Sequence, residues 1–385
     1  MYLMSHQLFG DGIHNDTLAL QELLDQRSAE VSLSMPEKFY LINKTLVIHS
    51  NQRLVLPRFC HIKLMDNSNC SMLANEPADT EDCNIEIEGG IWNLNNLGQM
   101  KNPFHFSHDE YPDYAGYIMH FRKVKNFRIA NITLKDPVTY AVTLDTVSYF
   151  TAENIIFDFN YGNPWPVNMD GIHCNGNCHY GNIRNLKGSC YDDMVALNAD
   201  EGSAGPITNI DIDGICSTDS HSAVRLLTVK FPLENIHIHN VFGTYYQYCI
   251  GISKYYDGDS TGYYDAIRID NIYVSKAERL SIYQKDGSYV YPIIWAESGL
   301  HIKNIHISDV YRKEYTTAVE TICVSPKVTI DYMTIENVSS ENHVGAMMPL
   351  LVNNGRIKAL TARGLHTDGD SVIVNNGDIQ LHHES

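Results

Sequence analysis

Three acidic residues stand at the start of two successive apolar runs in the middle of the chain. Asp170 lies two residues before Ile172, and Asp193, which follows Asp192 directly, lies two residues before Val195. If both runs are strands on neighbouring turns of a repeating fold, their spacing of about 4.8 Å brings the carboxyl groups close together. Carboxylates gathered at one place repel each other, so this arrangement points to chemistry rather than to a plain structural repeat.

Neighbouring carboxyl groups are suited to the hydrolysis of glycosidic bonds. One carboxyl can be kept protonated by its neighbours' charge and act as an acid, while another stays ionised and activates water. An inverting enzyme holds its acid and base about 6.5 to 9.5 Å apart so that water fits between them. In the same strand register His221 falls level with Asp192, so we group this histidine with the three acids as the candidate catalytic residues.

Two recurring sets of short strands must position these residues. In the first set, apolar and polar residues alternate, an Asn or Gly follows, and the alternation resumes, as in NFRIANITL at Asn126. Asn and Gly tolerate a left-handed backbone conformation, so we expect a bend there. The residues expected in this slot are Asn131, Asn240, Asn271, Asn304 and Gly214.

The second set of strands carries the acids. It includes DGIHC, MVALN, AVRLL, CIGISK, PIIWAE and AVETI. When these strands are aligned by their apolar residues, they predict one inward column of side chains. That column consists of Ile172, Val195, Val224, Ile250, Ile294 and Val319.

Each turn of the chain therefore offers one strand from each set and a variable loop. This pattern predicts an all-β protein, a right-handed parallel β-helix, as a single domain over residues 1–385. Residues 1–30 are expected to cap one end with a short helix that begins after Asp16. Residues 96–117 interrupt the repeat and are expected to form a long loop over one face.

Composition narrows the function classes. The 385 residues are 44% hydrophobic and 19% charged, which supports a large packed core, and the net charge of -18 argues against nucleic-acid or anionic-membrane partners. No apolar run is long enough to span a membrane, and no signal-peptide pattern opens the chain. We expect a cytoplasmic protein, or a secreted one if a signal peptide has been removed. No feature indicates an oligomeric state.

The cysteine pattern agrees with the expected cytoplasmic location. Nine scattered cysteines are interpreted as reduced thiols. The run HCNGNCH, residues 173–179, has two Cys and two His, but its spacing does not match a zinc pattern, and NGN reads as a turn. We therefore predict no metal and no cofactor.

Four motifs resemble those of the polygalacturonase-type glycoside hydrolases, family 28, within the pectin-lyase-like β-helix superfamily. Residues 168–170 match the Asn-x-Asp motif of that family, and residues 192–193 match its Asp-Asp pair. Residues 220–222 keep only the histidine of a Gly-His-Gly motif, and residues 252–254 keep only the lysine of Arg-Ile-Lys. The opening GDGIHNDT is also similar, so the resemblance covers most of the chain.

The resemblance implies roles for these residues. Asp192 would be the general acid, while Asp170 and Asp193 would position and deprotonate the water. His221 would tune the acid or bind substrate, and Lys254 would contact the sugar. The unmatched arginine helps to hold a galacturonate carboxylate in the family, so the resemblance does not fix polygalacturonate as the substrate.

Further residues are candidates for binding the sugar. Arg225 lies inside an apolar strand, where a charge is costly unless it is paired or lines a cleft, and it is predicted to point outward on the same column as His173. Trp165 and Trp295 offer faces on which sugar rings stack. The full set of candidate substrate-binding residues is Asn168, His173, Arg225, Lys254, Trp165 and Trp295.

Three hypotheses of function remain open on the sequence. The leading one is an inverting glycoside hydrolase for a plant-type or other oligosaccharide, with a uronic-acid-containing substrate as one option. The second is a polysaccharide lyase on the same architecture, which would need a base of near-neutral pKa and often calcium held by acids. The third is a carbohydrate-binding β-helix without activity, which would need no group of carboxylates.

Overall fold

The computed structural model describes residues 6–76, 80–108, 113–254, 260–278, 290–368 and 371–384. These residues form two compact units. The first unit contains residues 1–173, 178–182 and 190–192, and the second contains residues 174–177, 183–189 and 193–385. The single domain over residues 1–385 stays a prediction.

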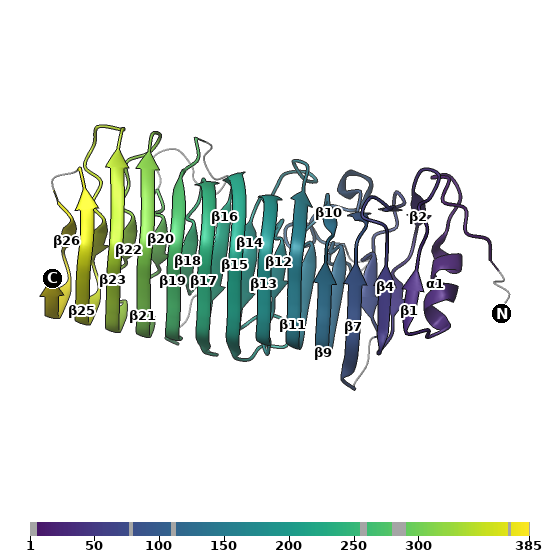
Figure 1. The fold of residues 1–385 in the computed structure, drawn as a ribbon, viewed down its shortest axis with the longest axis horizontal. Coiled ribbons are helices and arrows are strands. Elements are labelled where there is room, and N and C mark those ends of the chain that lie inside the picture. Colours follow the sequence, from purple (N-terminus) through teal and green to yellow (C-terminus); the bar gives the residue numbers. More distant parts are fainter. Residues whose placement is uncertain are drawn as a thin grey trace. The chain divides into compact units, whose positions relative to one another are not determined.

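The first unit begins with the helix α1 and continues as parallel strands, of which β9 and β11 are long (Figure 1). Its elements are α1 (Thr17–Asp25), β1 (Glu30–Ser32), β2 (Tyr40–Ile42), β3 (Leu46–Ile48), β4 (Gln52–Val55), β5 (His61–Leu64), β6 (Leu73–Asn75), β7 (Asp82–Glu88), β8 (Ile91–Asn93), the 3-10 helix η1 (Asn96–Gly98), β9 (Met119–Ala130), β10 (Thr133–Lys135) and β11 (Val142–Asp158). Parallel pairing runs from β1 through β4, β7 and β9 to β11, and from β2 through β5 and β8 to β10. The strands β12 (Ile172–Cys174) and β13 (His179–Ser189) contain residues of both units.

The second unit alternates short and long strands (Figure 1). The short strands are β14 (Asp193–Asn198), β16 (Ser222–Leu227), β18 (Ile250–Ser253), β20 (Ile294–Ala296), β22 (Ile322–Val324), β24 (Leu351–Asn353) and β26 (Ile373–Asn375). The long strands are β15 (Ile207–Ser220), β17 (Leu233–Tyr245), β19 (Gly262–Lys276), β21 (Leu300–Glu314), β23 (Thr329–Asn342), β25 (Arg356–Thr367) and β27 (Asp378–Glu384). Each set forms its own parallel ladder, so the two predicted strand sets are confirmed in this unit.

The core of the second unit consists of columns of equivalent apolar residues. In the long strands Ile210, Ile236, Ile267, Ile305 and Met333 are successive register partners, and all are buried. Each coil thus covers the apolar face of the coil before it, which removes from water a surface that no single coil could bury.

The predicted column in the short strands is confirmed from Val195 to Ile294 and wrong at Val319. Val195, Val224, Ile250 and Ile294 are register partners, but the next partner is Ile322. Val319 lies in an irregular segment before β22, where its carbonyl accepts a hydrogen bond from the Arg312 guanidinium. A buried arginine therefore holds this segment outside the strand ladder, and the register partner of Ile294 lies three residues onward.

The left-handed slot is confirmed at most of the predicted positions. Asn131, Asn240, Asn271 and Gly214 have positive φ angles of 56°, 58°, 54° and 81°. Asn304 does not, and Asp309 takes the slot on β21 with a φ of 53°. The register pairs Ile272 with Val310, so the residue before each occupies the equivalent position.

The N-terminal segment holds the expected helix, but Asp16 has a different role from the one predicted. Asp16 stands at the N-cap position of α1 without a side-chain bond to the helix. Its carboxylate instead accepts hydrogen bonds from the backbone N–H groups of Phe9, Gly10 and Leu41. Asn15 accepts from the Thr17 N–H at the start of the helix.

Two further observations concern cysteines and helices. All nine cysteines are free, which agrees with the reduced thiols expected from their scatter. Among the described residues no helix combines the length and apolar character that crossing a membrane requires.

Gly243 offers a test of the close stacking of coils. Its φ is +126°, and a Cβ there would lie 1.7 Å from the carbonyl oxygen of Ser217 on the adjacent coil. We expect Gly243→Ala to lower the free energy of unfolding by about 2 to 4 kcal/mol, because backbone strain and overpacking add. Urea denaturation measures the change.

Gly345 provides the matched control. Its φ is +82°, but nothing lies within 4 Å of an added Cβ, so Gly345→Ala should cost about 1 kcal/mol through backbone strain alone. Equal losses in the two variants would contradict the close approach of the coils at Gly243.

Candidate active site

Asp170 is held in place by a histidine of the same short segment. The two residues before β12, Asp170 and Gly171, offer carbonyls that accept from the N–H groups of Ala141 and Val142 at the start of β11. This backbone pairing leaves the Asp170 side chain buried, with its Oδ2 2.6 Å from Nδ1 of His173. The orientation of Asp170 is therefore fixed by the strand pairing and by a side-chain partner.

His173 is itself fully buried. Its ring stacks on Tyr140, with centroids 3.8 Å apart and planes 7° apart, and Tyr140 stacks in turn on Tyr117. The imidazole has an exposed fraction of 0%. His173 therefore contacts Asp170 and aromatic rings, and its place suits positioning the acid better than touching a sugar.

The segment before Asp170 is held by the loop insert. The Asn168 Oδ1 lies 3.1 Å from the Asn102 amide, which donates to it, and 3.0 Å from Nε2 of His105. Trp165 is 43% exposed, and its ring lies 5.7 Å from that of Phe106. Described residues of the insert thus contact both Asn168 and Trp165. Residues 109–112 of the insert lie outside the described residues, and a loop that covers one face stays a prediction.

Asp193 begins β14 and is bound from the neighbouring coil of the second unit. It is the register partner of Ser222, whose hydroxyl donates to its Oδ1. The Nε of Arg225 lies 3.3 Å from its Oδ2, so a guanidinium charge stands beside the buried carboxylate. The expected outward position of Arg225 agrees with its partial exposure on a strand that is otherwise buried.

His221 extends this group by one residue. Its Nδ1 lies 3.1 Å from the Ser222 Oγ. Because the only Ser222 proton is donated to Asp193, the Nδ1–H of His221 must be the donor in this contact. Asp192 is also buried and precedes Asp193 directly in the chain.

An aromatic wall adjoins His221. The His221 imidazole meets the Tyr246 ring edge-on with ring centroids 5.3 Å apart, and the Tyr248 ring at 6.4 Å. Tyr248 stacks in turn on Trp295, with centroids 5.8 Å apart. The Trp295 indole donates to the Ser325 hydroxyl at 3.1 Å. Trp295 is thus joined to His221 through one tyrosine.

Lys276, the last residue of β19, supports this aromatic wall. It is not among the candidate residues that the sequence predicts. Its buried ammonium donates to the carbonyls of Tyr246, Gln247 and Tyr291. Burial, together with the nearby Arg312 charge, lowers its pKa to about 7. A lysine at a strand end is usually solvated, so the sequence carried no signal of its role.

A second group of charges surrounds Lys254, which follows β18. Its backbone N–H donates to Oε2 of Glu297 at 2.7 Å. Burial raises the pKa of Glu297, while that hydrogen bond and the charges of Arg225 and Lys254 act to lower it. Lys254 also lines a concavity of about 490 Å³. The other basic residues that line it are His301, Lys327, Arg356 and Lys358.

The candidate residues therefore fall into local groups. In the first unit, Asp170 meets His173, and Asn168 meets the insert. In the second unit, Ser222 joins His221 to Asp193, and Arg225 stands beside Asp193. Side-chain partners hold both carboxylates in place, and Asp193 also stands beside the charge of Arg225, an arrangement that suits acid–base chemistry.

We expect Lys276→Met to destabilise the protein by about 2 kcal/mol or more, because buried carbonyls lose their donor. Chemical denaturation measures the change. Lys303→Met is the control, since Lys303 pairs with Asp265 on the surface, and it should leave stability nearly unchanged. If Lys276→Met were equally silent, the proposed support of the wall would be wrong.

Comparison with known proteins identifies solved structures that have a similar fold. No family model matches the sequence, and neither does any curated protein. A polygalacturonase from Erwinia carotovora matches at 16% identity over 90% of this chain and 94% of that chain, with a TM-score of 0.61. A family 28 exopolygalacturonase from Yersinia enterocolitica matches at 14% identity over 97% and 76%, with a TM-score of 0.60.

The surface adhesin PfbA of Streptococcus pneumoniae also matches, at 13% identity over 98% of this chain and 91% of that chain, with a TM-score of 0.57. Proteins named as hydrolases and as an adhesin thus share this architecture, and at such identities the likeness concerns the fold alone. The chain has the right-handed parallel β-helix fold that these solved structures share.

Proposed function

We propose that the protein is an inverting glycoside hydrolase for an oligosaccharide that contains uronic acid. The observation that carries this proposal is the binding of Asp193, whose buried carboxylate has Ser222 at one oxygen and Arg225 at the other. A carboxylate that is buried only to cap a turn needs no such pair of side-chain partners. A base that must stay ionised and keep one orientation does.

In the proposed reaction, Asp192 donates its proton to the leaving glycosidic oxygen as the bond to the anomeric carbon breaks. Water attacks that carbon from the opposite face, and Asp170 and Asp193 position the water and take its proton. One proton leaves the enzyme and one returns, so the total charge of the site is restored after product release. The free sugar has the inverted anomeric configuration.

The partners of the acids have positioning roles in this mechanism. His173 fixes Asp170 by its hydrogen bond and is fixed by the Tyr140 ring. His221 donates to Ser222, which donates to Asp193, so these three residues form one hydrogen-bonded row. Groups held in this way need little reorganisation in the transition state.

Local positive charge supports an acidic sugar as the substrate. The chain carries a net charge of -18, which repels polyanions unless cations stand where the sugar binds. Arg225 stands beside Asp193. Burial raises the pKa of Glu297, and the charges of Arg225 and Lys254 lie close enough to oppose that rise. Trp295 and the adjoining tyrosines supply a face for stacking.

We expect Asp192→Asn to lower kcat by about 100-fold or more, because the amide cannot donate the proton. The assay is reducing-sugar release from galacturonides, rhamnogalacturonan fragments and neutral oligosaccharides, with the product anomer read by NMR. Asp309→Asn makes the same chemical change at a partly exposed Asp that accepts from Asn337, and it should retain full activity.

Other outcomes of this assay would overturn the proposal. Formation of unsaturated uronides would identify a lyase. Sugar binding without turnover, equal in the parent and in Asp192→Asn, would identify a carbohydrate-binding protein. Retained anomeric configuration would contradict the inverting mechanism.

The acidic-sugar proposal has its own test in Lys254→Met. Loss of a charge-assisted contact should raise KM for a galacturonide about 10-fold or more, with a small effect on kcat. The same oligosaccharide with its carboxyl groups reduced to alcohols should show no change in KM between the parent and the variant. Equal losses on both substrates would show that Lys254 does not recognise the carboxylate.

A further inference from the structure

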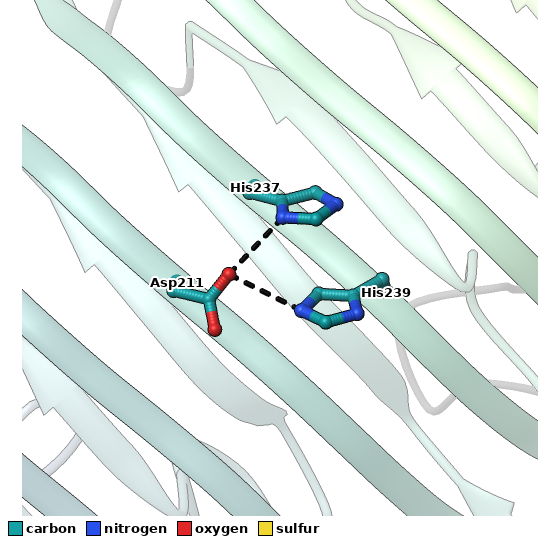
Figure 2. Close-up of side chains that lie close together, drawn as sticks. All are labelled: Asp211, His237 and His239. Carbon is teal, nitrogen blue, oxygen red and sulfur yellow. Dashed lines mark hydrogen bonds and ion pairs between the residues drawn. The ribbon is translucent and has the colours of Figure 1, made fainter.

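Two histidines and an aspartate of the second unit meet on neighbouring long strands. Asp211 lies on β15, and His237 and His239 lie on β17, where residues two apart point to the same face (Figure 2). The register pairs Asp211 with His237 and Asp213 with His239. All three side chains are partly exposed, so the group is open to solvent.

The donor atoms of the three side chains converge. The Oδ1 of Asp211 lies 3.1 Å from Nδ1 of His237 and 3.1 Å from Nε2 of His239 (Figure 2). One ligand atom from each residue lies within 4.8 Å of the others. Tetrahedral zinc with bonds of about 2.0 to 2.1 Å separates its ligand atoms by about 3.3 Å, which is close to these distances.

The remaining ring nitrogen of His237 faces a further carboxylate. Nε2 of His237 lies 2.7 Å from Oδ2 of Asp270 on β19, whereas Nδ1 of His239 lies 3.2 Å from the Asn240 amide nitrogen and 3.6 Å from Oδ1 of Asp213. Histidines that bind metals through one nitrogen commonly donate the other N–H to a carboxylate, which fixes the tautomer and strengthens the ligand. The three aspartates also give this surface a negative charge that favours a cation.

Counting protons shows that a neutral His237 ring does not satisfy both of its contacts. A neutral imidazole carries one N–H, yet His237 has a carboxylate oxygen within 3.1 Å of each ring nitrogen. Either a second proton on the ring or a metal ion at one nitrogen satisfies both contacts, and the titration below distinguishes the two. A metal ion bound by Nδ1 and by Asp211 satisfies them because Nε2–H is left to donate to Asp270.

We propose that Asp211, His237 and His239 bind a divalent transition-metal ion, with water in the fourth position. Two imidazole ligands favour Zn²⁺ and similar ions over Ca²⁺ or Mg²⁺, which prefer oxygen. The ion joins two adjacent coils through β15 and β17. Its ligands are separate from the residues proposed for hydrolysis, which lie on or beside the short strands, so the inference stands without the proposed activity.

The test is calorimetric titration of the metal-free, full-length protein with Zn²⁺ and, separately, with Ca²⁺. One equivalent of Zn²⁺ should bind, Ca²⁺ should not compete, and saturating Zn²⁺ should raise the melting temperature because the ion binds the folded state. Asp211→Asn and His239→Ala should weaken binding about 100-fold or more. Asp270→Asn should weaken it about 10- to 100-fold through the hydrogen bond to His237.

His301→Ala is the matched control. His301 is also partly exposed, and its Nε2 lies 3.1 Å from Oδ2 of Asp331, but it belongs to no comparable group among the described residues. This variant should bind Zn²⁺ like the parent. Absence of Zn²⁺ binding, or equal affinity in the parent, Asp211→Asn and His239→Ala, would overturn the proposal.

Folding of the variants is checked without metal. The ligands are partly exposed, so each variant should melt within a few degrees of the metal-free parent. Asp211→Asn keeps the size and shape of the side chain, and therefore decides the matter if His239→Ala does not fold.

Discussion

Parallel hydrogen bonding between equivalent strands of successive coils is the constraint on which the rest of each unit depends. It fixes which residue stacks on which, so the apolar columns close over one another in every coil. A slip of one residue would turn Ile210 and its partners to the outside. The polar residues at the strand starts are placed by the same register, which is how Ser222 comes to face Asp193.

This repeat explains why chemistry is found at the margins of the strands. Interior positions must stay apolar and alike from coil to coil, whereas strand starts and outward positions can differ. Asp193 and Asp170 occupy strand starts, while Asp211, His237 and His239 occupy outward positions of long strands. Polygalacturonases and the adhesin PfbA share this architecture, so residues at the margins, rather than the fold, distinguish one function from another.

The sequence predicts the repeat well because its signals are local. Alternating apolar residues and the Asn or Gly slots identify both strand sets, and the pairing of Asp193 with Ser222 follows from aligning them. The errors arise where contacts beyond the local pattern decide the structure. Arg312 binds the Val319 carbonyl outside the strand, and Asp309 takes the slot expected for Asn304. Lys276 and the histidines of β17 carry no local signal, since both look like ordinary polar positions of a strand.

The amides in the left-handed slots add a constraint on chain length. The Asn271 side chain donates to Asn240, which donates to Asp213, so a row of hydrogen bonds crosses β19, β17 and β15. An inserted or deleted residue within one of these strands would break that row and the apolar column together. Insertions and deletions are therefore tolerable only in the connections between strands. Natural variants of this protein should differ in loop length and keep the same number of residues in each strand.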